Sequence, residues 1–219
     1  MLELAAFLGN PGKEYSRNRH NVGFLLAEKL PFYNSLSWQK KFKGLYAAME
    51  RDRPNSAGEL VPEPPPRLHF IKPQTFMNLS GESVFQAASF FKIKTGAIIV
   101  IHDELELPLG TVSLKFSGGL GGHNGLRSMK ACFASADFWR IRIGIGRPDS
   151  RLPGEGGPPG SGEGIVDWVL SDFSANEEEK LNLVLEAASD LLLKTFSGDP
   201  AKLLPEWAKK KIPGPAAEC

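Results

Sequence analysis

Six short apolar runs, with helical patterns between several of them, set the strongest constraint on how this chain can fold. Each run has the length and composition of a buried strand; the runs are residues 2–9, 44–49, 67–72, 97–103, 111–116 and 138–146. Helical spacing of apolar residues occurs in four other segments, which are residues 20–30, 80–91, 124–133 and the stretch that follows Ser174. Strands that alternate with helices pack as a sheet covered on both faces. The sequence therefore predicts an α/β sandwich, in which we expect at least one antiparallel pairing near residues 111–116.

A chain of 219 residues is most simply one domain, and we predict a single domain over residues 1–219. Two segments, residues 53–66 and 148–164, are rich in proline or glycine and contain few apolar side chains. Such segments cannot build a core of their own. We interpret both as loop insertions within the domain.

Composition and charge exclude several classes of protein. Twenty-six basic and 25 acidic residues leave a formal charge of +1, so any contact with nucleic acid must come from local clustering of charge. The two cysteines, Cys132 and Cys219, form neither a disulfide framework nor a zinc-binding pattern. The apolar runs are too short to span a bilayer, and the N-terminus lacks the pattern of a signal peptide. We expect a cytoplasmic protein with no membrane partner.

Common catalytic and nucleotide-binding motifs are missing from the sequence. There is no G-x-S-x-G nucleophile elbow, and GNPGKE is too short for a P-loop and lacks the hydroxyl that would hold magnesium. The cluster SGGLGGHNG does not satisfy the dinucleotide-binding pattern, and the four histidines show no zinc-ligand spacing. These absences argue against a serine hydrolase of that class, a dinucleotide-dependent enzyme and a zinc enzyme.

Polar side chains instead gather where the predicted strands end and the helices begin. They are Asn10, His20, Asn78, Asp103 and Asn124. In an open α/β sheet, the carboxyl ends of the strands form the crevice in which ligands bind. A histidine and an aspartate brought together there can act as a base and the group that orients it, and amides can hold a peptide-like substrate.

Each of these residues also has a purely structural interpretation. Asn10, before Pro11-Gly12, is a common turn residue, and Asn78 and Asn124 are common helix caps. His20 could be a structural histidine, and Asp103 could cap a turn. Their joint placement at strand ends favours a functional site.

Four segments carry a resemblance to a known family. They are LGNPGKEYSRNRHNVGF, KPQTFMNLSGESV, VIHDELELPLGTVSLKFSGGLGGHNGLRSM and FWRIRIGIGRP. Together they resemble the bacterial-type peptidyl-tRNA hydrolase family. The resemblance implies a single-domain α/β/α sandwich with a twisted, mixed, mostly parallel sheet. It also implies a monomer, without metal or organic cofactor, that hydrolyses the ester between a peptide and the 3′ end of tRNA and so recycles tRNA from prematurely released peptidyl-tRNA.

The same resemblance assigns roles to individual residues. His20 matches the catalytic base, Asp103 its carboxylate partner, and Asn10 an amide at the reacting group. The residues that match the site for the peptide and the tRNA 3′ end are Tyr15, Met77, Asn78, His123 and Asn124. Lys115 and Arg142 match basic positions that grip tRNA phosphates. A neutral imidazole near pH 7 can take a proton from water as the water attacks the ester carbonyl.

We expect the tRNA-binding patch to extend around the glycine loop. Its members are Lys115, Arg127, Lys130, Arg140, Arg142 and Arg147. Two lysine runs, at residues 40–43 and 209–211, are interpreted as solvated surface charge. Ser117 departs from the family pattern, which often has a glycine there, and residues 148–164 adjoin the family's lid.

Two other functions remain open at this point. The first is a catalytically silent RNA-binding or splicing factor on the same fold, against which the complete set of site residues argues. The second is an esterase that uses the same His–Asp pair on small esters without tRNA.

Overall fold

The computed structural model describes residues 1–51, 67–148 and 162–214. Within these residues an eight-stranded sheet has the strand order β2-β3-β4-β1-β5-β7-β6-β8. The strands are β1 (Leu4–Phe7), β2 (Gln39–Lys41), β3 (Gly44–Glu50), β4 (Arg67–Pro73), β5 (Ile98–Glu104), β6 (Thr111–Phe116), β7 (Trp139–Gly144) and β8 (Lys210–Lys211).

The centre of the sheet is parallel and both sides are antiparallel. β1 pairs in parallel with β4 and β5, and β5 pairs in parallel with β7. β3 runs antiparallel to β2 and β4, and β6 runs antiparallel to β7 and β8. The predicted mixed sheet is therefore confirmed, including the antiparallel pairing at residues 111–116. Because β4, β1 and β5 are parallel, the segments that follow them leave the sheet at the same edge.

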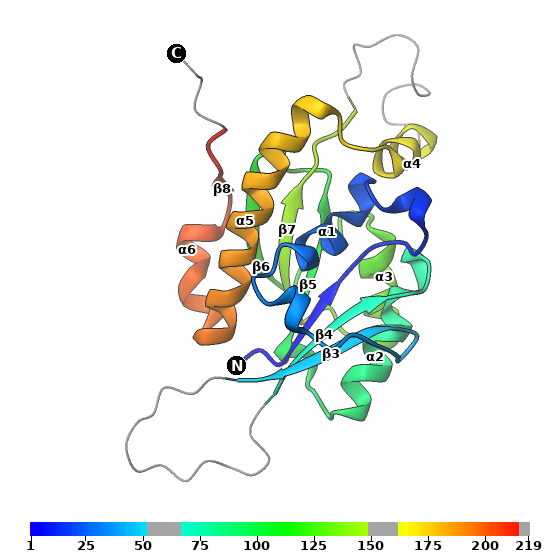
Figure 1. Ribbon diagram of the computed structural model, residues 1–219, viewed down its shortest axis with the longest axis vertical. Coiled ribbons are helices and arrows are strands. Elements are labelled where there is room, and N and C mark those ends of the chain that lie inside the picture. Colours follow the sequence, from blue (N-terminus) through cyan, green and yellow to red (C-terminus); the bar gives the residue numbers. More distant parts are fainter. Residues whose placement is uncertain (52–66, 149–161, 215–219) are drawn as a thin grey trace.

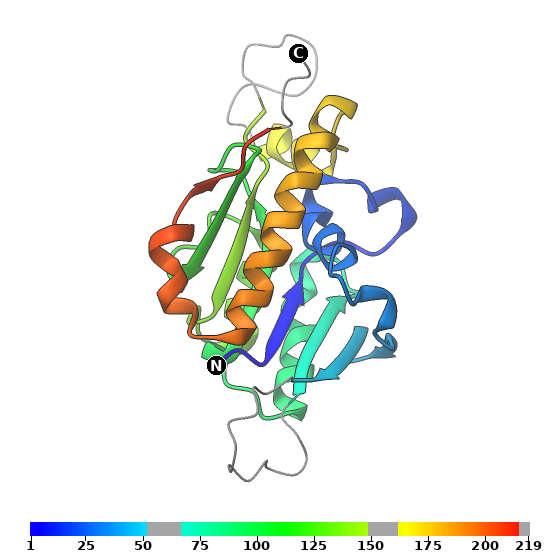
Figure 2. The same cartoon turned by 60° about the vertical axis from the view of Figure 1, so that its left-hand side comes forward.

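Helices cover both faces of the sheet, which confirms the α/β/α sandwich (Figures 1 and 2). On one face lie α1 (Val22–Glu28) and α5 (Ala175–Ser197), and on the other lie α2 (Ser80–Phe90) and α3 (Asn124–Phe133). Side chains of β1 alternate between two cores. Ala5 and Phe7 pack with residues of α1 and α5, whereas Leu4, Ala6 and Leu8 pack with residues of α2 and α3. This burial on both faces explains why the run is apolar throughout rather than at every second residue.

The remaining elements are short. They are α4 (Gly162–Leu170), α6 (Leu204–Trp207) and the 3-10 helices η1 (Lys13–Tyr15), η2 (Arg19–Asn21), η3 (Tyr33–Ser35), η4 (Met77–Leu79), η5 (Thr95–Ala97) and η6 (Pro200–Leu203). No helix in the described part of the chain is long and apolar enough to cross a membrane.

Several short elements were not predicted, among them β2, β8, α4 and α6. β2 and β8 consist of lysine and glutamine, so they carry no apolar signal and are held by backbone pairing to β3 and β6. α4 begins at Gly162, so the prediction of a loop over residues 148–164 is wrong for its last three residues. The predicted insertion at 53–66, and residues 149–161 of the second, lie outside the described residues.

Candidate active site

Asn10 lies just beyond β1 and is fixed by hydrogen bonds on three sides. Its backbone N–H donates to Asn21 Oδ1 at 2.8 Å, and Asn21 Nδ2 donates to the Asn10 carbonyl at 2.9 Å. The Asn10 side-chain Oδ1 accepts a hydrogen bond from the backbone N–H of Met77 at 2.7 Å. Since Oδ1 is held by Met77, the Nδ2 group of Asn10 is left as a donor, and it has no partner among the described residues. Asn10 can therefore donate to a bound ligand.

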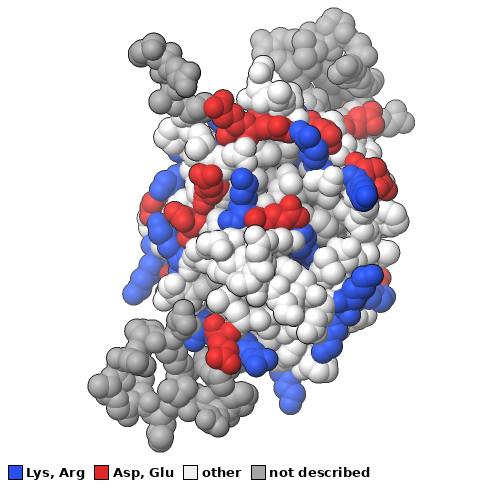
Figure 3. All heavy atoms as spheres, viewed as in Figure 1, with Lys and Arg blue, Asp and Glu red and all other residues white. Residues whose placement is uncertain are grey.

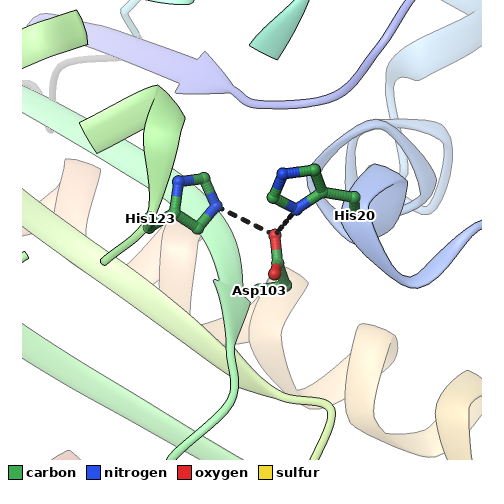
Figure 4. A group of neighbouring side chains, drawn as sticks. All are labelled: His20, Asp103 and His123. Carbon is green, nitrogen blue, oxygen red and sulfur yellow. Dashed lines mark hydrogen bonds and ion pairs between the residues drawn. The ribbon is translucent and has the colours of Figure 1, made fainter. Parts of the chain in front are cut away.

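His20, Asp103 and His123 meet at the carboxyl end of β5 (Figure 4). Asp103 Oδ1 lies 2.8 Å from His20 Nδ1 and 2.9 Å from His123 Nε2. The two imidazole rings are 4.9 Å apart, centroid to centroid. Asp103 is 3% exposed, so one buried carboxylate oxygen serves both rings.

Hydrogen bonds fix which nitrogen of each ring carries a proton. His123 is the N-cap of α3, and its Nδ1 accepts hydrogen bonds from the N–H groups of Gly125 and Leu126 at 3.1 and 3.3 Å. The proton of neutral His123 therefore lies on Nε2, which donates to Asp103. His20 donates to Asp103 through Nδ1, so the Nε2 of neutral His20 carries a lone pair and makes no hydrogen bond within the described residues. That lone pair is available to a substrate or a water molecule.

The charges of the group agree with this arrangement. Burial alone would raise the pKa of Asp103, but the two histidines and their hydrogen bonds outweigh burial and hold this pKa well below its usual value. Burial would lower the pKa of His20, but the charge and the hydrogen bond of Asp103 outweigh burial and raise it. Asp103 is thus an ionised carboxylate that stabilises the protonated form of His20, as a base requires of its partner.

The same three residues are the candidate ligands for a metal ion, since their ligand atoms lie within 4.8 Å of one another. The donor set fits poorly. A metal on His123 Nε2 would move the ring proton to Nδ1, where it would face the two N–H groups of the α3 N-terminus. Proton transfer suits these contacts better than metal binding does.

Comparison with known proteins agrees with this geometry. The family model described as peptidyl-tRNA hydrolase matches residues 4–214. The chain belongs to the peptidyl-tRNA hydrolase family. It is 41% identical to the peptidyl-tRNA hydrolase of Treponema pallidum over 214 residues, which cover 96% of each chain. It is 42% identical to that of Rhodospirillum centenum over 202 residues, 92% of this chain and 78% of the relative. The crystal structure of peptidyl-tRNA hydrolase from Acinetobacter baumannii superposes with a TM-score of 0.77 at 31% identity and covers 96% of each chain.

Asn78 and Asn124, which the family resemblance assigns to the substrate, have exposed side chains. Neither caps a helix. Asn78 is the middle residue of η4, and α3 is capped by the His123 side chain, so the interpretation of these asparagines as caps is wrong. The Asn124 amide oxygen accepts one long hydrogen bond, of 3.5 Å, from Arg127. Tyr15, at the end of η1, is partly exposed, and Met77 is buried.

Lys115 and Arg142 lie in a group of cations beside the glycine loop. Arg142 Nε donates to Glu104 at 2.9 Å, and both side chains are mostly buried. Burial, with the charges of Arg140 and Arg142, lowers the pKa of Lys115. Arg140 is 1% exposed and donates to the carbonyls of Ser117 and Gly119, so its assignment to a surface patch is wrong. These hydrogen bonds hold the glycine loop against β7.

Two residues of the site were missed at the sequence level. Asn21 orients Asn10 through the hydrogen bonds described above, and it is 2% exposed. Arg19, which directly precedes His20, is only 4% exposed even though it carries a charge. The unusual run Arg19-His20-Asn21 was a visible signal, but a sequence does not indicate that a charged residue beside a catalytic one turns inward.

Proposed function

We propose that this chain hydrolyses the ester that joins a peptide to the 3′-terminal ribose of tRNA, and so recycles tRNA from prematurely released peptidyl-tRNA. The observation that carries the proposal is the His20–Asp103 pair. Its 2.8 Å hydrogen bond leaves the Nε2 of neutral His20 unprotonated and unpartnered within the described residues. The next residue, Asn21, holds the Asn10 backbone, and the Asn10 amide donor is free among the described residues.

The reaction needs two proton transfers, and His20 can perform both. A water molecule gives a proton to His20 Nε2 as its oxygen attacks the ester carbonyl, and the negative charge of the intermediate falls on the carbonyl oxygen. Asn10 Nδ2 donates to that oxygen; loss of such a donor typically costs about 10²–10³ in rate. When the C–O bond to ribose breaks, protonated His20 returns the proton to the departing ribose oxygen. The products are a peptide carboxylic acid and tRNA with a free 3′ hydroxyl.

Selectivity for a blocked amino group comes from neutral amides. Asn78 directly follows Met77, and Asn124 directly follows His123. Both asparagines are exposed. They can pair with the N–H and C=O groups of a peptide, whereas the ammonium of an aminoacyl group would need an anion. A polar site whose groups stay unpaired discriminates strongly.

The acceptor end of tRNA is held by Lys115 and Arg142. The positive charges of Lys115, Arg140 and Arg142 act on one another, and the negative charge of Glu104, which pairs with Arg142, partly offsets them. The excess positive charge fits a phosphate. We further propose that the chain acts as a single-domain monomer in the cytoplasm without metal or cofactor; gel filtration of the purified chain tests the first point.

The test is release of peptide from N-acetyl-aminoacyl-tRNA, with unblocked aminoacyl-tRNA as the control substrate. We expect wild type to cleave only the blocked substrate. The rate of His20→Ala should fall by a factor of about 10²–10⁴, while the variant stays folded. A folded wild type that binds tRNA without cleaving it would indicate the catalytically silent RNA-binding alternative. Cleavage of small esters at a comparable rate without tRNA would indicate a different esterase.

A further inference from the structure

A basic depression lies at the turn between β2 and β3, outside the catalytic group. Its volume is about 650 Å³. The residues that line it are Lys40, Lys41, Phe42, Lys43, Gly44, Leu45, Gln74 and Thr75. The turn is tight, because Phe42 and Lys43 both have left-handed backbone conformations with φ of 55° and 53°. Three ammonium groups are thus presented from four consecutive residues.

The depression holds more positive than negative charge. Lys43 Nζ pairs with Glu82 Oε2 at 2.7 Å. Lys41 Nζ instead lies 5.4 Å and 5.3 Å from the ring centroids of Phe42 and Phe90. Neither Lys40 nor Lys41 pairs with a carboxylate in the described residues. A carboxylate that enters the depression would therefore meet two ammonium groups that no acidic side chain of the described residues neutralises.

A buried polar atom also lacks a partner at this position. The Thr75 hydroxyl makes no hydrogen bond, although its oxygen is shielded from solvent. Buried hydroxyl groups in proteins are normally hydrogen-bonded. Because this oxygen is shielded, a ligand in the depression does not reach it, and the attraction comes from the lysines.

The depression joins the proposed active site through the segment that follows β4. The Gln74 N–H donates to the Lys43 carbonyl at 2.9 Å, and three residues later the Met77 N–H donates to Asn10 Oδ1 at 2.7 Å. Three extended residues span at most about 11 Å. A peptide advances by about the same length per residue, so the third or fourth residue from the ester reaches the depression.

The order of strands indicates which part of the substrate lies here. The β2–β3 turn is on one side of β1, and β6 and β7, which carry Lys115 and Arg142, are on the other. If tRNA phosphates lie over β6 and β7 and the ester lies at the ends of β1 and β5, the acyl group points toward β4 and β3. The occupant of the depression is then peptide rather than RNA.

We infer that this depression is a subsite for acidic side chains of the peptide, within about the first four residues from the ester. The inference rests on the proposed function. Lys40 and Lys41 supply the charge that attracts the carboxylate. The subsite makes the chain prefer peptides with glutamate or aspartate close to the C-terminus.

The test compares three blocked peptidyl-tRNAs with the same tRNA and the same esterified residue, and with glutamate, glutamine or lysine at the next three positions. We expect kcat/KM for the glutamate peptide to exceed that for the glutamine peptide by about five-fold, through KM and with kcat unchanged, because exposed ion pairs are individually weak. The double variant Lys40→Gln/Lys41→Gln should abolish this preference. The matched control Lys94→Gln/Lys194→Gln changes two exposed lysines outside the depression and should retain it.

Equal kcat/KM for the three substrates in wild type would overturn the inference and leave the proposed function intact. So would a Lys40→Gln/Lys41→Gln variant that binds deacylated tRNA more weakly and cleaves all three peptides equally less well, since the lysines would then contact RNA. Failure of wild type to cleave even the glutamine peptide would overturn the proposed function itself, and the inference with it.

Discussion

The two carboxylate oxygens of Glu177 bind the guanidinium of Arg19 at 3.0 and 2.8 Å. Arg19 also stacks on the ring of Trp168, 3.8 Å from its centroid, and its backbone N–H donates to the Ser171 carbonyl at 3.0 Å. The turn that carries His20 is therefore attached to the end of α4 and the start of α5. A bidentate ion pair of this kind, with a buried guanidinium and a partly buried carboxylate, fixes geometry more reliably than it adds net stability.

Replacement of Arg19 should cost both stability and rate. Arg19→Ala leaves Glu177 without its partner and empties the space against Trp168, so we expect the free energy of unfolding to fall by about 3–5 kcal/mol. Arg19→Lys keeps the charge but loses the bidentate contact, and kcat should fall more than KM rises because His20 is less well placed. Urea denaturation and steady-state kinetics measure the two effects. An Arg19→Ala protein with the midpoint and kcat of wild type would contradict this account.

The rate should rise with pH as His20 loses its proton. Since Asp103 raises the pKa of His20, the half-maximal kcat/KM should lie above pH 6.5. Asp103→Asn removes the charge and leaves burial, which lowers this pKa. The midpoint should therefore move to lower pH, while the maximal rate falls by about 10²–10⁴. A pH–rate profile of both proteins, corrected for spontaneous ester hydrolysis, decides the matter; an unchanged midpoint would remove Asp103 from the mechanism.

Asn21 should matter through Asn10 alone. Asn21→Ala removes both hydrogen bonds to the Asn10 backbone, and a displacement of about 1 Å at a catalytic group can cost about 10² in rate. Asn21→Asp keeps the acceptor for the Asn10 N–H but places a buried carboxylate oxygen against the Asn10 carbonyl, so its loss should be no smaller. The measurement is kcat for both variants beside Asn10→Ala. The Asn10→Ala/Asn21→Ala double variant should be no slower than Asn10→Ala, and additive losses would mean that Asn21 acts independently.

Moderate acid should destabilise the fold through His69. Burial, assisted by Arg67, lowers the pKa of His69 to about 4, whereas in the unfolded chain it stays at its usual 6.5. The unfolded state therefore binds the proton first, and the stability that neutral His69 confers is present above pH 6.5 and is lost as the pH falls from 6.5 toward 4. His69 accepts from or donates to the Tyr46 hydroxyl at 2.7 Å and lies 4.1 Å from the Phe91 ring. We expect His69→Phe to flatten the fall of melting temperature across this window; an identical slope in both proteins would rule His69 out.

Salt should weaken substrate binding through the cations beside the glycine loop. If Lys115 contacts a phosphate, Lys115→Gln should lower the slope of log(kcat/KM) against log[salt] by about 0.7–0.9 between about 50 and 200 mM. Lys194→Gln, an exposed lysine on α5, is the matched control and should leave the slope unchanged. Equal slopes for all three proteins would exclude a phosphate contact at Lys115.

The sequence predicted those parts of the molecule that local patterns encode. β6 begins and ends at the predicted residues, and α3 has the predicted bounds, because apolar spacing and glycine mark both of them. The His20–Asp103 contact was also expected, since strand ends converge in a parallel sheet. The sequence did not predict that His123 hydrogen-bonds to the same oxygen of Asp103. That role depends on a helix cap and a neighbouring strand that are 20 residues apart in sequence, and such a contact leaves no local pattern.

β1 lies in the middle of the sheet, yet it precedes both of its neighbours, β4 and β5, in the sequence. Its partners begin at Arg67 and Ile98, so the apolar segment around Phe7 leaves the exit tunnel long before either neighbour exists. During translation it must stay unpaired or be shielded by a chaperone, because pairing between distant segments is slow and exposed strands aggregate. A truncated product that stops before Asp103 would have His20 but no carboxylate to orient it. Synthesis of this chain, if interrupted there, would leave a peptidyl-tRNA, which is the class of molecule that the folded chain hydrolyses.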